Sequence, residues 1–358
     1  MNDSSTENSC PTGLFVSGYR WSGSGAVIDW LSGCPGLSVA PEDLAPLGEI
    51  RALTYGIRDL FAVATGGIRL GERIARAALC PDKAVARTTL GAGEAGPVMH
   101  ALDTVYTIAV ANRLRPPITM YKHYLDAQLG SDFRYDQEYL RAVSRFADAL
   151  RGARHSDNPC SHSALRWAIS NLLCLMGTRV APAGSTHVFD NALPAARPEM
   201  FELIDPTVFP VRVVILVARD PRDQFVELVE HSNSTFSWSY TSFIQRYREA
   251  RRRTDAFLAR RKQQPGPGRE MYRCVSFEDF VLNVRSIQDD LQTQITTLLN
   301  PSGTDGAAMP QHWISDRFNP EESARNIGIW KRSALKRQIR AIEYSLPEYL
   351  YQEPCASS

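Results

Sequence analysis

The chain has 358 residues, of which 44% are hydrophobic and 22% charged, and its formal net charge is +1. This composition is typical of a globular protein with a large core, and the near-neutral charge excludes a general attraction to nucleic acid or membrane surfaces. The seven cysteines lack metal-type spacing and predict reduced thiols. The N-terminus is polar and has no signal sequence, and no long apolar stretch predicts a membrane span, so we expect a cytoplasmic protein.

The N-terminal part carries a strand, a Gly/Ser-rich turn and a helix. Residues 1–12 are polar and predict a disordered leader, and a strand is expected over 13–18 with a helix from Gly25 to Leu31. Backbone N–H groups of such a turn and of the helix N-terminus converge on one point and bind anions. Gly18 and Gly23 have the spacing of the first half of a Walker A loop, but no Lys-Ser/Thr follows. The turn therefore predicts a phosphate-type site without ATP or GTP chemistry.

The middle of the chain, residues 47–176, has mainly helical periodicity. We expect a helical insertion there, either as an acceptor pocket or as a plain packing layer. A short strand is expected at 185–189 and a buried parallel strand at 211–218, whose sequence VRVVILVA is apolar except for Arg212. Arg-Asp-Pro-Arg-Asp, residues 219–223, follows that strand directly.

A basic helix is expected over 240–262, either as a solvated face or as a guide for an anionic acceptor. Another strand and helix follow in MYRCVSFEDFVLN, then a loop over about 300–320 and a C-terminal helix over 333–346. Strands that alternate with helices predict an α/β fold: a P-loop-like central parallel sheet flanked by helices, with ligands at the carboxyl ends of the strands. We expect one domain over 13–350 and a tail of residues 351–358.

Three segments, in this order, resemble motifs of bacterial-type sulfotransferases that use 3′-phosphoadenosine-5′-phosphosulfate (PAPS). They are Ser22-Gly23-Ser24-Gly25, the Arg-Asp-Pro-Arg-Asp segment, and residues 325–332 with Gly328 and Trp330. The resemblance implies in-line transfer of a sulfuryl group from PAPS to an acceptor hydroxyl, with 3′-phosphoadenosine-5′-phosphate (PAP) as product. The acceptor implied is a carbohydrate or glycolipid, or else a small metabolite. Two anionic ends on one donor need two phosphate sites and no metal ion.

The same resemblance implies which residues hold the donor. For the 5′-phosphosulfate they are Arg20, Trp21, Ser22, Gly23, Ser24, Gly25 and Ala26, and for the rest of the nucleotide Arg219, Arg325, Trp330 and Lys331. Trp21 aligns with the cation of the family loop, so Arg20 is expected to take its catalytic role. Glu227 stands where the family often has a serine, which leaves Ser232 or Ser234 as further candidates for the 3′-phosphate.

A general base must remove the acceptor proton. His187 lies in a Thr-His segment similar to that of the family, and a neutral imidazole suits this role near pH 7. Asp190 is expected to orient His187 or to replace it, and Glu49 is a third candidate. Asp220 and Asp223 are expected to hold their loop together through hydrogen bonds, with Arg222 paired to one of them.

Cys160, His162 and His155 lack the spacing of a zinc site, so we assign no metal. Two other functions stay open: a P-loop kinase-like phosphotransferase, and a non-catalytic nucleotide-binding protein. The first predicts Mg²⁺-dependent turnover of ATP, and the second predicts nucleotide binding without sulfuryl transfer.

Overall fold

The computed structural model describes most of the predicted α/β part of the chain. The described residues are 12–19, 21–39, 186–191, 193, 195–231, 239–266, 268–299, 313 and 315–352, with scattered helical positions between 145 and 174. The predicted leader before Thr12, nearly all of the predicted insertion at 47–176 and the tail from residue 353 onward lie outside them.

Five strands form one sheet in the order β2-β3-β1-β4-β5. The strands are β1 (Thr12–Gly18), β2 (Leu37–Val39), β3 (Thr186–Asp190), β4 (Val211–Ala218) and β5 (Arg269–Ser276). β4 and β5 are parallel, with Val211 opposite Arg269 and Ala218 opposite Ser276. Every residue of β4 except the last is buried, including Arg212, whose Nη2 pairs with the Glu270 carboxylate at 2.8 Å. The predicted α/β fold with a central parallel sheet is confirmed.

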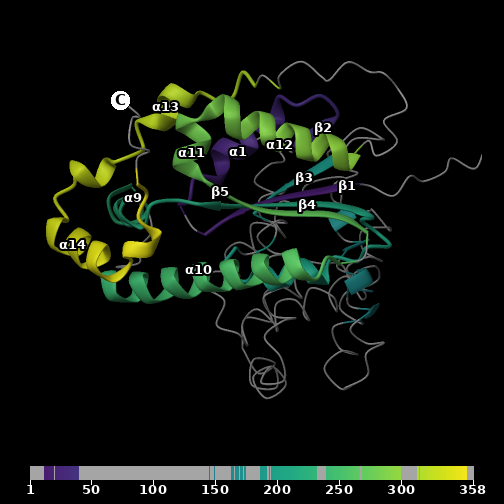
Figure 1. The fold of residues 1–358 in the computed structure, drawn as a ribbon, viewed down its shortest axis with the longest axis horizontal. Coiled ribbons are helices and arrows are strands. Elements are labelled where there is room, and N and C mark those ends of the chain that lie inside the picture. The colour runs from purple at the N-terminus through teal and green to yellow at the C-terminus, as the bar shows by residue number, and fades with distance from the viewer. Residues whose placement is uncertain are drawn as a thin grey trace, which may run out of the picture. The chain divides into compact units, whose positions relative to one another are not determined.

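Helices cover the sheet on both faces, as Figure 1 shows: α1, α11 and α12 lie on one side of β4 and β5, and α10 on the other. The helices are α1 (Ser24–Ser32), α9 (Pro221–Val226), α10 (Tyr240–Gln263), α11 (Phe277–Leu282), α12 (Val284–Leu299), α13 (Pro320–Ala324) and α14 (Lys336–Ser345). Short 3₁₀-helical segments are η2 (Pro198–Leu203), η4 (Ile329–Lys331) and η5 (Pro347–Tyr349), and η3 (Glu227–His231) is a π-helical turn that continues α9.

The chain divides into two compact units. One comprises residues 13–39, 194–198 and 211–358 and holds α1, β4, β5 and all later elements. The other comprises residues 1–12, 40–193 and 199–210 and holds β3. In this second unit Phe189 and Phe209 pack edge to face, with ring centroids 6.0 Å apart.

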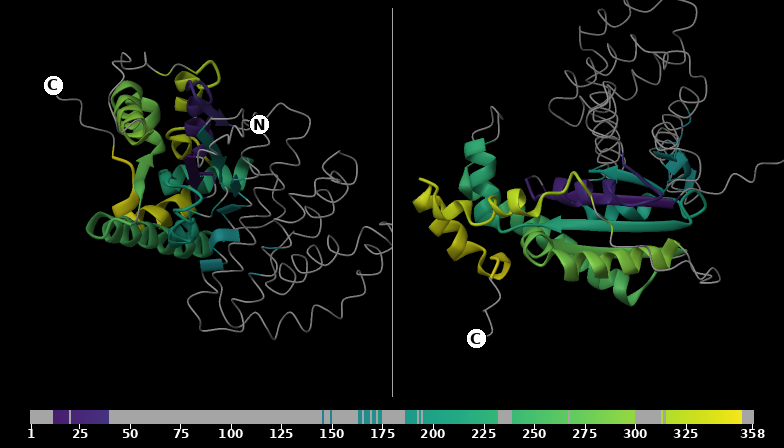
Figure 2. Two further views of the ribbon diagram at one scale, coloured as in Figure 1. Left: turned by 90° about the vertical axis from the view of Figure 1, so that its right-hand side faces the viewer. Right: turned by 90° about the horizontal axis from the view of Figure 1, so that it is seen from above.

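The unit that holds α1 has its own apolar core. One cluster joins α9, α10 and α14 through Phe225, Phe243, Tyr247, Ile342 and Leu346. The C-terminal segment from α13 to η5, yellow in Figures 1 and 2, lies at the end of the strands where β4 leads into α9. This packing brings the last motif of the chain next to the Arg-Asp-Pro-Arg-Asp segment.

Candidate functional site

The turn between β1 and α1 is the candidate anion cradle that the sequence predicts. Gly23 is the N-cap residue of α1 and adopts the left-handed conformation, with φ 82° and ψ 19°. A Cβ atom at this position would lie 2.2 Å from a ring carbon of Phe277, so both the backbone angle and the space require glycine. Among the described residues no side chain caps α1, and its first turn holds no acidic residue. The positive end of the helix dipole is therefore available to an anion.

Ser22 adds an unsatisfied donor to this cradle. Its side chain is buried, and its Oγ has no hydrogen-bond partner within the described part of the chain. A buried hydroxyl without a partner costs about 1–3 kcal/mol, which a bound anion would recover. Gly25, by contrast, is exposed, and a Cβ atom there would have no neighbour within 4 Å. The cradle thus has a buried donor and an open side.

Arg219, the first residue after β4, links the cradle to the last motif. Its Nη1 donates to the carbonyl oxygen of Trp21 at 3.1 Å, and its Nη2 donates to the carbonyl oxygen of Asn326 at 2.6 Å. The guanidinium also lies over the ring of Phe277, 5.0 Å from its centroid. Gln224, on α9, donates to the carbonyl oxygen of Tyr19. Both loops are therefore fixed by the segment that follows β4.

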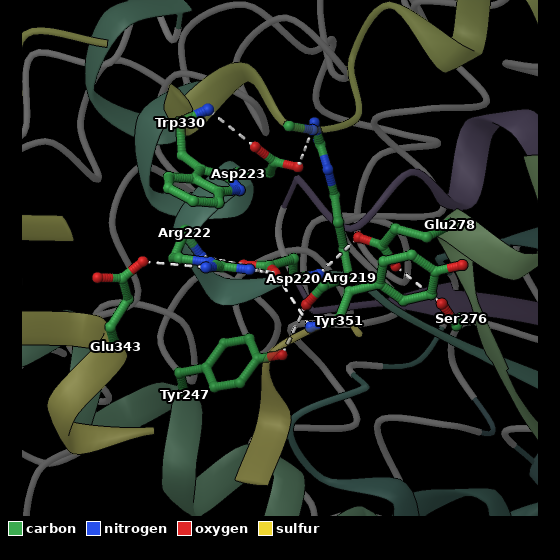
Figure 3. A network of polar contacts seen from close by, with 11 residues as sticks. Arg219, Asp220, Arg222, Asp223, Tyr247, Ser276, Glu278, Trp330, Glu343 and Tyr351 are labelled. Carbon is green, nitrogen blue, oxygen red and sulfur yellow. Dashed lines mark hydrogen bonds and ion pairs between the residues drawn. The ribbon is translucent and has the colours of Figure 1, made fainter. Parts of the chain in front are cut away.

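Asp223 holds the turn that contains Gly328 and Trp330. Its carboxylate accepts hydrogen bonds from the backbone N–H of Gly328 at 2.6 Å and of Trp330 at 3.0 Å (Figure 3). Gly328 has φ 72°, which only glycine adopts without strain. Burial raises the pKa of Asp223, and the two N–H donors act against that shift. The expected role of Asp223 in tying loops together is confirmed.

Arg222 supports the ring of Trp330. Its guanidinium carbon lies 3.9 Å from the ring centroid, and its Nη2 and Nη1 pair with Asp220 at 2.6 Å and Glu343 at 3.0 Å (Figure 3). Asp220 also accepts from the backbone N–H of Tyr351 at 3.0 Å. The expected pairing of Arg222 with an aspartate is confirmed, and one face of the Trp330 ring is already occupied by this cation.

Phe277 and Glu278 also belong to this network, although no role there was predicted for them. Glu278 is buried and accepts from the Asp220 backbone N–H at 2.7 Å and from the Ser276 hydroxyl at 2.8 Å. Burial raises the pKa of Glu278. Ser276 also caps α11 by accepting from the N–H of Asp279. The Ser-Phe-Glu-Asp step itself could have signalled a capped helix start, but not the neighbours of Phe277.

Other predicted donor-binding residues lie around this network. Trp21 is 46% exposed, Ser24 is buried at the first position of α1, and the backbone N–H of Ala26 donates to the carbonyl oxygen of Gly23 at 3.1 Å. Arg325 and Lys331 are exposed, one on each side of the turn that Asp223 holds. The structure thus brings Trp21–Ala26, Arg219, Arg325, Trp330 and Lys331 into one unit.

The candidate bases His187 and Asp190 belong to the other compact unit. His187 is buried on β3, burial lowers its pKa, and its Nδ1 has no hydrogen-bond partner among the residues that the structure describes. Asp190 accepts from the side-chain amide of Asn191 at 2.6 Å. Arg20, Glu49, Ser232 and Ser234 lie outside the described residues.

The described residues contain no group of three His, Cys, Asp or Glu side chains that could hold a metal ion. In the same part of the chain, no helix is both long and apolar enough to cross a membrane.

Comparison with known proteins gives one structural similarity. No protein-family model matches the chain, and no curated protein matches it in sequence. A solved structure, the sulfotransferase domain from the Synechococcus PCC 7002 olefin synthase, matches with a TM-score of 0.37 and 14% sequence identity over 96% of each chain. Because both values are low, the functional assignment rests on the geometry of the site.

Proposed function

We propose that this protein is a sulfotransferase that moves a sulfuryl group from PAPS to an acceptor hydroxyl and releases PAP. The observation that carries the proposal is the pair of hydrogen bonds from Arg219 to the carbonyl oxygens of Trp21 and Asn326. These two hydrogen bonds connect Arg219 to the cradle on one side and, on the other, to the turn that Arg325 and Lys331 flank. A nucleotide with a phosphate at each end needs such a pair of sites.

The residues present fit a phosphosulfate group at the cradle. The uncapped N-terminus of α1 and the unpartnered Ser22 hydroxyl both favour an anion, and the first turn of α1 carries no carboxylate that would repel one. Arg325 and Lys331 supply exposed positive charge beside the second turn. The cradle lacks the lysine that would reach a terminal phosphate of ATP, which disfavours the kinase-like alternative.

When bound, PAPS supplies a sulfuryl group whose bond to a phosphate oxygen breaks as the bond to the acceptor oxygen forms. Negative charge then develops on the departing phosphate oxygen, and the N-terminal N–H groups of α1 would stabilise it. His187 is proposed to accept the hydroxyl proton. Its lowered pKa keeps the imidazole neutral at pH 7, which is the form that a base requires. Trp330, held by Arg222 and Asp223, would contact the nucleotide.

The proposal is tested with two measurements on the same preparation. Isothermal calorimetry with PAP should give saturable binding with one site per chain. Transfer of labelled sulfate from PAPS to a panel of carbohydrates, phenols and lipids should then show which hydroxyl is modified. Binding without transfer to any acceptor would favour the non-catalytic alternative, whereas ATP turnover with Mg²⁺ would favour the kinase-like one.

A further inference from the structure

Arg219 has a nearby negative charge but retains an unused hydrogen-bond donor. The Glu227 carboxylate lies 3.6 Å from Arg219 Nη2, a separation that allows Coulomb attraction but is too long for a good hydrogen bond. Arg219 Nε is buried and has no hydrogen-bond partner in the described part of the chain. Arg219 Nε can therefore take one further acceptor.

Glu227 stands on the solvent side of this pair. Its side chain is 22% exposed, whereas that of Arg219 is 4% exposed. Glu227 is also the first residue of the π-helical turn η3, and π-helical turns occur frequently at functional sites. An anion attracted by Arg219 would therefore lie close to the Glu227 carboxylate, the more exposed member of the pair. The two negative groups would repel each other and compete for the same cation.

We propose that Glu227 determines how tightly the site holds a nucleotide with a 3′-phosphate, by competing with that phosphate for Arg219. The inference rests on the proposed function, because it places a 3′-phosphate near Arg219. A neutral side chain at this position would remove the carboxylate that competes with the phosphate for the positive charge of Arg219. With glutamate present, the 3′-phosphate is bound weakly, which favours release of the PAP product.

The experiment compares two nucleotides that differ only in the 3′-phosphate. PAP and adenosine 5′-phosphate are titrated by calorimetry, at one fixed salt concentration, into the wild-type protein and the Glu227→Gln variant. Glu230→Gln is the matched control: it removes one charge from the same turn, but its carboxylate accepts from the Ser333 hydroxyl rather than facing Arg219. Glu227→Ser serves as a second variant, and thermal melting checks that each protein is folded.

We expect Glu227→Gln to bind PAP about tenfold more tightly than wild type, or better, while the affinity for adenosine 5′-phosphate changes less than about twofold. Glu230→Gln should leave the ratio of the two affinities unchanged. If both nucleotides bind but neither Glu227 variant raises the affinity for PAP selectively, the inference is wrong and the proposed function stands. If neither nucleotide binds to any of the folded proteins, both are wrong.

Discussion

A carboxylate placed in the first turn of α1 should weaken nucleotide binding without destabilising the fold. Gly25 is the second residue of that helix, is exposed, and has no atom within 4 Å of a Cβ atom built on it. Gly25→Asp therefore fits without steric cost. A negative charge at a helix N-terminus stabilises the helix by about 0.3–1 kcal/mol, so the variant should unfold no more easily than wild type.

The same charge opposes a bound phosphosulfate or 5′-phosphate. Two unit charges about 5 Å apart repel by about 1–3 kcal/mol as the effective dielectric constant falls from that of water to about 20. We therefore expect PAP to bind between about fivefold and 150-fold more weakly to Gly25→Asp, as measured by calorimetry. Gly25→Asn, of equal size and no charge, should stay near wild type. Equal affinities of the Asp and Asn variants would refute the assignment of the anion site to this helix.

Three further predictions concern the fold, the buried acid and the base. Gly23→Ala should lower the free energy of unfolding by at least about 2 kcal/mol in urea titration, because alanine is strained at φ 82° and its Cβ would lie 2.2 Å from Phe277. Gly25→Ala, the control, should not lower it. Equal stabilities of the two variants would disprove the close contact between Gly23 and Phe277. Glu278 has a raised pKa in the folded state, so its contribution to stability is complete at low pH and is lost as pH rises through that pKa. Glu278→Gln should therefore flatten the pH dependence of the free energy of unfolding. An unaltered pH dependence in this variant would contradict the raised pKa. His187→Ala should retain PAP binding and lose sulfuryl transfer, and unchanged turnover would reject His187 as the base. Because burial lowers the pKa of His187, the wild-type rate should decline on the acid side with a midpoint below about pH 6.5.

Local patterns predicted the elements that surround the site. The apolar residues before Gly18 and the glycines after it were enough to place β1, the turn and α1. The largely apolar strand β4 was predicted over the residues observed, Val211–Ala218. The expected roles of Asp220 and Asp223 followed from their place after a strand end. Secondary structure and loop hydrogen bonds of this kind can be predicted because they depend on residues that are close in sequence.

The hydrogen bonds and packing contacts that connect the motifs could not be predicted from the sequence. Arg219 was expected to hold a phosphate, but its two Nη donors go to backbone carbonyl oxygens 198 and 107 residues away. Any residue type offers such a carbonyl, so no sequence signal marks the acceptor. The contact of Phe277 with the Gly23 position and the π-helical geometry of η3 likewise depend on tertiary packing, which periodicity does not encode. β2, with three residues, is too short to show a period.

We expect one adenosine nucleotide to span the cradle and the turn that Asp223 holds, and a crystal structure of the protein with PAP bound would show this. The 5′-phosphate should lie at Ser22–Ala26, within hydrogen-bond distance of the α1 N–H groups, and the 3′-phosphate on Arg219, Arg325 or Lys331. A nucleotide bound elsewhere, or with only one phosphate in contact with these residues, would contradict it.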